Sequence, residues 1–329
     1  MTMMKYWQAI NLALAEELER DAAVVVFGED VGAAGGPFGA TMNLQERFGD
    51  RRVRDTPISE ATLVGAALGA SMTGLRPVVE VMFFDFIAMA MDQIVNQAAK
   101  ASYMSAGRFH APMVIRTLSG AGRSTGPQHS QNFEAWLAHV PGLKVVWGSQ
   151  PSDARGLLKS AIRDDDPVVV IESLSLWSLK GDVNDIDSDS GLVPIGKAAT
   201  VRHGTDVTIV SWGSAVHRCL AAAAQLDDQI SVEVVDLRTI SPIDSETVLD
   251  SVSRTGRLAV VHDAPEAFGG GAEVAALVAG HAWDHLRAPI VRVAAPFAPT
   301  PFPPHMEQAF FPQPDRIASS VVELMERTT

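Results

Sequence analysis

Cysteine is almost absent from this sequence of 329 residues, in which Cys219 is the only one. An internal disulfide is therefore excluded, and a reducing compartment is the expected environment. The short lead Met1-Thr2-Met3-Met4 runs straight into a helical pattern, with no signal peptide or Arg-rich transit segment. We expect a cytoplasmic, bacterial protein.

Positive charge is also scarce, because 26 Lys and Arg face 39 Asp and Glu and the net charge is −13. No basic stripe is present, which excludes a nucleic-acid surface. No apolar run reaches the roughly 18 residues, free of Gly, Pro and charge, that a membrane span needs. We therefore expect neither nucleic acid nor a membrane as a partner.

Apolar residues make up 47% of the chain, which is enough for two hydrophobic cores at a length that exceeds the usual size of one. Valine-rich runs alternate with helical patterns, the first of them a helix over about 4–20. This alternation predicts parallel sheets covered on both faces, in an α/β fold. The strands expected in the first half are Val24–Phe27, Val78–Phe83, Pro112–Leu118, Lys144–Gly148 and Val168–Glu172.

The composition between residues 181 and 196 turns to Gly, Asp, Asn and Ser, including Asp185, Asp187 and Asp189. This segment is typical of a solvated linker. The sequence thus predicts a first domain over 1–180, a linker over 181–196 and a second domain over 197–329. The strands expected in the second half are Val207–Trp212, Val232–Leu237, Leu258–His262 and Ile290–Ala294.

Two glycine- or proline-rich segments of the second half keep two interpretations each. Gly269-Gly270-Gly271 opens a helix and either holds an anion or packs against a neighbouring subunit. The run from Pro296 to Pro304 is either a groove ligand or, as we favour, a rigid arm that wraps its own domain or a partner. A final helix is expected from about Gln313 to Glu326.

The stretch from Pro57 to Pro77 predicts a buried helix that Ser59 caps and that is apolar and small almost without a break until Gly74. Its one acid, Glu60, lies in the first turn, where the helix dipole favours a carboxylate. A lone acid in such a helix needs a partner. Backbone N–H groups or an arginine are the ordinary partners, and a functional ligand is the other possibility.

Further candidates follow predicted strands. Glu29 and Asp30 end the first strand and either cap a turn or belong to a site. One of Phe83, Phe84 and Phe86 is placed to stack on a flat ligand, although core packing is the commoner fate. His129 ends a Gly-rich loop before a helix predicted near it, which leaves an acid–base role and a capping role open. The glycines between 32 and 39 fit no phosphate-binding spacing.

Taken together, these blocks resemble the β subunit of the first component (E1) of thiamine-diphosphate-dependent 2-oxoacid dehydrogenase complexes, the pyruvate, branched-chain and acetoin group. The resemblance spans essentially the whole chain and implies a transketolase-like pyrimidine-binding domain followed by a transketolase C-terminal-like domain, both doubly wound. The blocks that carry it include Gly28-Glu29-Asp30-Val31, Asp55-Thr56-Pro57-Ile58-Ser59-Glu60, Gly74-Leu75-Arg76-Pro77, Gln128-His129-Ser130-Gln131, Pro141-Gly142-Leu143-Lys144, Asp164-Asp165-Asp166-Pro167 and Asp236-Leu237-Arg238-Thr239-Ile240-Ser241-Pro242.

The resemblance also implies roles for four residues. Glu60 matches the glutamate that hydrogen-bonds N1′ of the aminopyrimidine of thiamine diphosphate, and Phe86 matches the ring that stacks on it. Glu29 matches a nearby acid that relays protons. His129 matches the histidine that faces the reacting carbons. A potassium ion held by main-chain carbonyls is implied at Met113, Ala161, Asp164 and Asp166.

In this family, the pattern that resembles a magnesium and diphosphate clamp is Gly-Asp-Gly followed by an Asn some 25 residues on. The chain lacks this pattern. We therefore expect an α subunit to hold Mg²⁺ and the diphosphate in an α2β2 heterotetramer. The C-terminal domain is expected to join β subunits and to dock the dihydrolipoyl acyltransferase (E2).

The implied function is decarboxylation of a 2-oxo acid, or cleavage of acetoin, with transfer of the acyl group to a lipoyl domain. The alternative is a two-component enzyme that uses thiamine diphosphate to join acyl units by C–C bonds in secondary metabolism, without a lipoyl partner. Ser105-Ala106-Gly107, Trp177 and Asp263 depart from the family's usual pattern and leave the substrate and the acyltransferase partner open.

Overall fold

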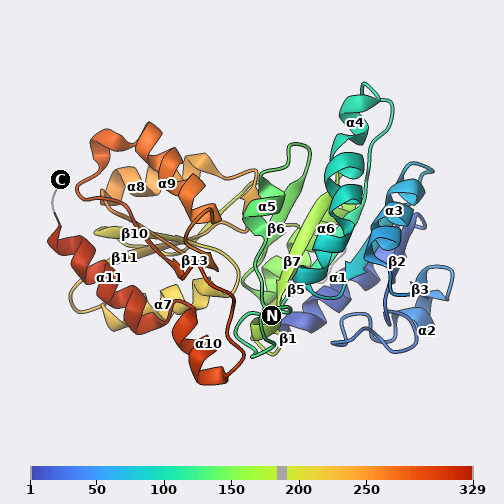
Figure 1. Ribbon diagram of the computed structural model, residues 1–329, viewed down its shortest axis with the longest axis horizontal. Helices are drawn as coiled ribbons and strands as arrows, with labels where there is room; N and C mark the ends of the chain where they lie inside the picture. Colours follow the sequence, from blue (N-terminus) through green and yellow to red (C-terminus); the bar gives the residue numbers. More distant parts are fainter. Residues whose placement is uncertain (1, 184–190, 328–329) are drawn as a thin grey trace. The chain divides into compact units, whose positions relative to one another are not determined.

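The computed structural model describes residues 2–183 and 191–327, and these residues form two compact units (Figure 1). Unit 1 comprises Met1–Gly120 and Trp136–Ile195, and unit 2 comprises Ala121–Ala135 and Gly196–Thr329. The chain therefore leaves unit 1 after Gly120, contributes a short segment to unit 2, and returns. The predicted linker acids Asp185, Asp187 and Asp189 lie outside the described residues.

Unit 1 contains a parallel sheet whose strands lie in the order β6-β7-β5-β4-β2-β3. The valine-rich runs form it as predicted, because a strand covered on both faces is apolar on both sides. The strands are β2 (Val24–Gly28), β3 (Val53–Asp55), β4 (Arg76–Val81), β5 (Val114–Ser119), β6 (Lys144–Trp147) and β7 (Val168–Ser173).

The helices α1 (Tyr6–Arg20) and α6 (Pro151–Arg163) pack together over one face of this sheet, on Val24 and Val26. Alternate side chains of a strand point to opposite faces, so Val25 and Phe27 face the other side, where α3 (Glu60–Ser71) lies. Unit 1 also contains α2 (Leu44–Phe48) and η4 (Leu174–Leu176).

Two local predictions for unit 1 are corrected. Residues at the start of the predicted first helix form β1 (Thr2–Lys5), which pairs antiparallel with β8 (Lys180–Val183). The residues after Phe86, through about Ser105, have a helical pattern that predicts one long helix, but they form a series of tighter and wider turns. These turns are η1 (Phe84–Ala90), η2 (a π-helix, Asp92–Gln97), η3 (Ala98–Lys100) and α4 (Ala101–Met104).

The predicted cap of α3 is wrong, and within unit 1 the helix is buried on one face. Ser59 makes no capping bond, because its hydroxyl donates to Thr62 Oγ1 at 2.8 Å instead. Only one face of the helix is buried, and Ala61, Ala66 and Gly69 on the other face are exposed. Small apolar residues therefore cover both faces of α3, although unit 1 covers only one of them.

Unit 2 contains a second sheet, in the order β14-β13-β10-β11-β9, and its core includes Cys219. All pairs are parallel except the antiparallel edge strand β9. The predicted α/β class is thus confirmed with one antiparallel edge. The strands of this sheet are β9 (Ala199–Arg202), β10 (Val207–Ser211), β11 (Val232–Asp236), β13 (Leu258–Pro265) and β14 (Val291–Ala295). The short β12 (Thr239–Ser241) is not part of it.

Two helices of unit 2, α9 (Gly270–His281) and α11 (Pro314–Glu326), begin close to the positions predicted for them. The Pro-rich run leads into a helix that the sequence did not predict, α10 (Pro304–Phe310). The other helices are α5 (Glu134–Ala138, which straddles the unit boundary), α7 (Ala215–Gln225), α8 (Ser245–Thr255) and η5 (Trp283–His285).

The glycine run at the start of α9 is explained by a buried histidine. His262 is fully buried and stacks on Trp212, with ring centroids 5.2 Å apart and planes within 9°. A Cβ on Gly269 or Gly271 would lie 2.6 Å from ring atoms of His262. The run therefore allows the helix to approach this imidazole, an interpretation that the sequence did not include.

Candidate active site

Three of the predicted site residues follow strands of the sheet in unit 1. Glu29 comes directly after β2, Glu60 opens the helix after β3, and Phe86 lies in η1 after β4. These strands are parallel neighbours, so all three residues belong to the carboxyl edge of the sheet. Ligands of open α/β sheets bind at this edge.

Glu60 is the buried acid of this edge, with 4% of the residue exposed. Its Oε2 is buried and has no hydrogen-bond partner among the described residues. Neither ordinary solution, an arginine or a backbone N–H group, therefore serves this oxygen. A buried carboxylate oxygen without a donor is costly, so the site fits a ligand that donates a hydrogen bond to it.

Glu29 lies in the electrostatic field of Glu60. Burial raises the pKa of Glu29, and the charges of Glu60, Asp30 and Glu80 raise it further. Like charges shift one another in this way only at short range. Two acids predicted to belong to one site therefore interact, and Glu29 takes up a proton more readily than an isolated glutamate.

Phe86 differs from the two other phenylalanines of its segment. Phe83 and Phe84 are 9% and 0% exposed, whereas Phe86 is half-buried and meets Phe83 edge to face at 6.2 Å. Phe86 is thus held by an aromatic cluster without being enclosed in it. This is the environment that a ring needs if it is to stack on a flat ligand.

An ion cluster that the sequence did not predict lies inside the same sheet. Arg116 on β5 bonds Glu80 on β4 at 2.6 Å and Glu172 on β7 at 2.8 and 2.9 Å, and all three residues are buried. Burial alone would lower the pKa of Arg116, but the charges of Glu172 and Glu80 outweigh it and raise the pKa. Single charges inside valine-rich runs are rare, and they were the available signal.

His129 lies in the segment of residues 121–135 that belongs to unit 2. It is half-buried in a turn, where its N–H donates to the Gly126 carbonyl at 3.2 Å and its carbonyl accepts from Thr125 Oγ1 at 3.1 Å. The next helix begins only at Glu134, so the capping role is not supported. The same segment lines a cavity of about 280 Å³ together with Asp263 and Phe297.

Glu134 ends this segment inside unit 2. Glu134 is 0% exposed. Its Oε1 accepts a hydrogen bond from Trp212 Nε1 at 3.3 Å, and its Oε2 has no hydrogen-bond partner among the described residues. Burial raises the pKa of Glu134 to about 7, although its hydrogen bonds act in the opposite direction. The segment that carries His129 is thus attached to unit 2 through an acid that is readily protonated.

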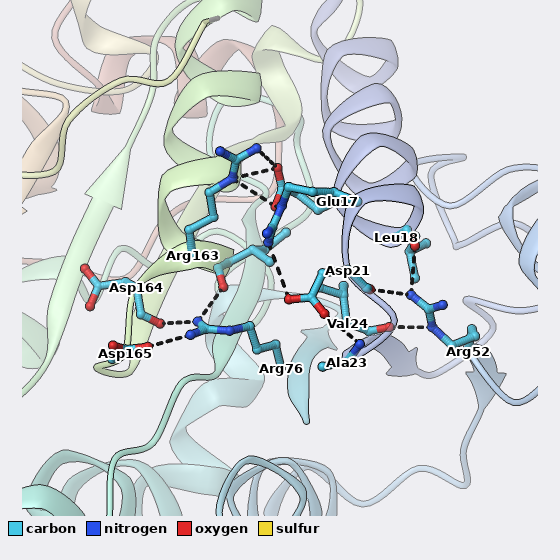
Figure 2. Close-up of polar contacts among 12 residues, drawn as sticks. Glu17, Leu18, Asp21, Ala23, Val24, Arg52, Arg76, Arg163, Asp164 and Asp165 are labelled. Atoms are coloured by element: carbon cyan, nitrogen blue, oxygen red, sulfur yellow. Dashed lines mark hydrogen bonds and ion pairs between the residues drawn. The ribbon is translucent and has the colours of Figure 1, made fainter. Parts of the chain in front are cut away.

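The predicted potassium loop contacts two cationic side chains. The Arg76 guanidinium donates to the carbonyl oxygens of Ile162 and Asp164 at 3.1 and 2.9 Å and pairs with Asp165, and Lys144 pairs with Asp164 at 2.8 Å (Figure 2 shows the contacts of Arg76 with Asp164 and Asp165). The carbonyls of Met113 and Ala161 each accept a backbone N–H, from Val168 and Asp164. Several oxygens named for the ion therefore already accept hydrogen bonds.

Within residues 2–183 and 191–327, no group of three or more His, Cys, Asp or Glu side chains is arranged to hold a metal ion. The same ranges contain no helix that is both long and apolar enough to cross a membrane.

The comparisons with known proteins agree with this architecture. Residues 2–178 match the family model described as the transketolase pyrimidine-binding domain, and residues 196–317 match that of the transketolase C-terminal domain. A solved structure, "Split gene transketolase, inactive beta4 tetramer", superimposes with a TM-score of 0.81 at 21% identity and covers 99% of both chains. Fold and domain order thus define a transketolase-like chain.

Relatives narrow this class. The 2-oxoisovalerate dehydrogenase subunit beta of Bacillus subtilis (strain 168) is 44% identical and covers 99% of this chain and 100% of its own. The pyruvate dehydrogenase E1 subunit beta of that strain is 45% identical, over 92% and 93% of the two chains. The beta subunit of acetoin:2,6-dichlorophenolindophenol oxidoreductase of Cupriavidus necator is 45% identical, over 97% and 96%.

This chain belongs to the family of E1 β subunits of 2-oxoacid and acetoin dehydrogenases. It is a subunit of a thiamine-diphosphate-dependent oxidoreductase, and an α subunit is its partner. The resemblance stated from the sequence is therefore confirmed.

Proposed function

We propose that this chain supplies the pyrimidine half of a thiamine diphosphate site in an α2β2 enzyme that decarboxylates a 2-oxo acid, or cleaves acetoin, and passes the acyl group to the lipoyl domain of an E2 partner. The relatives named for all three substrates are about equally similar to the chain. The observation that carries the proposal is the buried Oε2 of Glu60, which has no donor among the described residues. No finding favours the alternative of a C–C bond-forming enzyme without a lipoyl partner.

In this proposal Glu60 holds a proton between its carboxyl group and N1′ of the aminopyrimidine. Bound thiamine diphosphate supplies the electron sink for decarboxylation. Water has little access to a carboxyl group at the buried start of α3, so this group can share a proton with a weakly basic ring nitrogen. Glu60 thereby favours the form of the ring that accepts a proton at its exocyclic nitrogen.

Two other residues of the edge have roles in this proposal, one in binding the aminopyrimidine and one in proton exchange. Phe86 stacks on the aminopyrimidine, since its ring is fixed by Phe83 but not enclosed. Glu29, whose raised pKa makes it a readier proton acceptor, exchanges protons with Glu60. His129, which lies in the segment of unit 2 and not at this edge, keeps its predicted role of facing the reacting carbons.

The α subunit holds Mg²⁺ and the diphosphate in this proposal. The exposed face of α3 supports a covering partner, because Ala61, Ala66 and Gly69 let another backbone approach closely. A hollow of about 720 Å³ beside this helix is lined by Phe27, Leu63 and other residues of the unit. The cytoplasmic location and the roles of the C-terminal domain in β–β contact and E2 docking stay predictions.

The potassium site also stays a prediction. An ion there would share the Asp164 carbonyl with Arg76. Melting the complex in KCl and in NaCl at equal ionic strength tests it. Binding predicts a higher melting temperature in KCl, since a saturating ligand at 100 times its Kd adds about 2.7 kcal/mol. Equal melting temperatures would contradict the prediction.

The test of the function is Glu60→Gln in the assembled complex, with exposed Glu46→Gln as its control. Turnover of pyruvate, 2-oxoisovalerate and acetoin with an artificial electron acceptor is measured with thiamine diphosphate present. We expect Glu60→Gln to lose at least roughly 10²-fold, as is usual when an acid–base group is removed. Near wild-type turnover of this variant would refute the assignment.

A further inference from the structure

A buried glutamate of α10 holds the segment that carries His129. Glu307 is 3% exposed, and its two carboxylate oxygens face the loop after β5. Oε1 accepts from the Gly122 N–H at 3.0 Å, and Oε2 accepts from the Ser124 N–H at 2.7 Å and from Ser124 Oγ at 3.2 Å. One carboxylate thus fixes two amides of a loop that is 185 residues away in sequence from it.

The residues just before and after Glu307 support the same loop. A Cβ on Gly126, where φ is +81°, would lie 3.1 Å from the Phe302 ring, so the ring packs directly on this glycine. Ala121 at the start of the loop is buried in a cluster with Ala295 and Phe311. The Pro-rich arm and α10 therefore support the loop from residue 121 to residue 126, within unit 2.

This arrangement is more specific than ordinary packing. A carboxylate is an acceptor without hydrogens, so two converging N–H groups match it and match no neutral side chain of the same shape. Hydrogen bonds to a charged group are also roughly twice as strong as neutral ones. The turn that contains His129, with its Gly126 carbonyl, comes immediately after the fixed residues.

We propose that Glu307 is a positioning residue for His129: by binding the Gly122 and Ser124 amides it fixes the loop from which His129 acts. The inference rests on the proposed function, in which His129 faces the reacting carbons. It assigns a role to the Pro-rich arm and α10 that does not depend on a partner subunit.

The first measurement is hydrogen exchange of peptides spanning residues 119–135 in the assembled enzyme. Glu307→Gln keeps the shape but turns an NH₂ group toward an N–H donor, so exchange of this segment should rise roughly tenfold or more. Ser124→Ala, which removes only the weaker hydroxyl contact, is the matched control and should change exchange by no more than about twofold. Unchanged exchange in Glu307→Gln would overturn the proposal.

The second measurement is a double-mutant cycle on turnover. Misplacing a catalytic group by about 1 Å costs up to 10²-fold, so we expect Glu307→Gln to lower kcat by roughly 10- to 10²-fold with KM little changed. In a His129→Ala background the same substitution should have almost no further effect, because the residue it positions is gone. Glu307→Asp retains the charge and should recover part of kcat, and it replaces Glu307→Gln in the cycle if the latter does not assemble.

The outcomes separate the inference from the proposed function. Additive losses in the double variant would refute positioning through His129 and leave the role of His129 intact. Wild-type turnover of His129→Ala would refute that role, and the inference with it. Faster exchange with unchanged kcat would show that Glu307 holds the loop without serving His129, and would also overturn the inference.

Discussion

Glu134 is a buried acid whose ionisation opposes folding, and this makes the stability of unit 2 depend on pH. Burial raises its pKa from 4.5 to about 7, the charge of Asp263 acts in the same direction, and the bonds from its own backbone N–H and from Trp212 act against them. Replacing it with glutamine keeps the size and an oxygen for Trp212 Nε1 and removes the titration.

The direction in which stability changes with pH follows from proton binding by Glu134. Between pH 4.5 and about 7 the folded chain holds a proton on Glu134 that the unfolded chain has released. The stabilisation is therefore fully present below pH 4.5 and is lost as the pH rises through about 7. One pKa unit corresponds to about 1.4 kcal/mol, so the whole window is worth roughly 3 kcal/mol and the interval from pH 5 to 8 about 2.5 kcal/mol.

The assay compares thermal unfolding of the complex with wild-type β chain and with Glu134→Gln at pH 5 and pH 8. His262 titrates in the opposite sense, because burial lowers its pKa from 6.5 to about 4, but it is present in both proteins and cancels in the difference. We expect the melting temperature of the variant, relative to wild type, to rise by roughly 5 °C or more from pH 5 to 8. A difference that is the same at both pH values would refute the reasoning.

Two further predictions concern stability. Arg116→Met should destabilise unit 1 by roughly 3–5 kcal/mol, because it leaves the buried carboxylate of Glu172 uncompensated, and denaturant unfolding measures this loss; a change below about 1 kcal/mol would contradict it. Gly271→Ala should cost roughly 1–3 kcal/mol, because its Cβ would lie 2.6 Å from His262 Nε2. Gly280→Ala in the same helix meets no atom within 4 Å and is the control; it should be neutral or stabilising by up to about 1 kcal/mol, and equal losses in both variants would contradict the steric argument.

The sequence was most informative about the two sheets. Buried parallel strands are almost uniformly apolar, so β2, β7 and β10 were found from valine content alone. β1 was missed because its pairing with β8 involves the far end of the unit and leaves no local pattern. The irregular turns from η1 to α4 were missed because propensity does not distinguish α, 3₁₀ and π turns that packing imposes.

The residues of the candidate site also differ in how much local sequence signal they carry. Glu60 stood out as a single acid in an apolar helix, and Glu29 as an acid at a strand end, but local sequence left a structural and a functional role open for both, and their site roles stay predictions. Arg116 and its partners left a weaker signal, charges inside apolar runs. Glu307 left none, because its meaning depends on amides 185 residues away.

The excursion of residues 121–135 into unit 2 limits how this protein can be divided. A gene cut at the junction near residue 196 would encode a first fragment that carries residues 121–135 without the rest of the unit to which they belong. Ala121 and Glu134 would then face water on a piece that has no place to bury them. The chain crosses between the two units more than once. Recombination between relatives should therefore preserve the two units together.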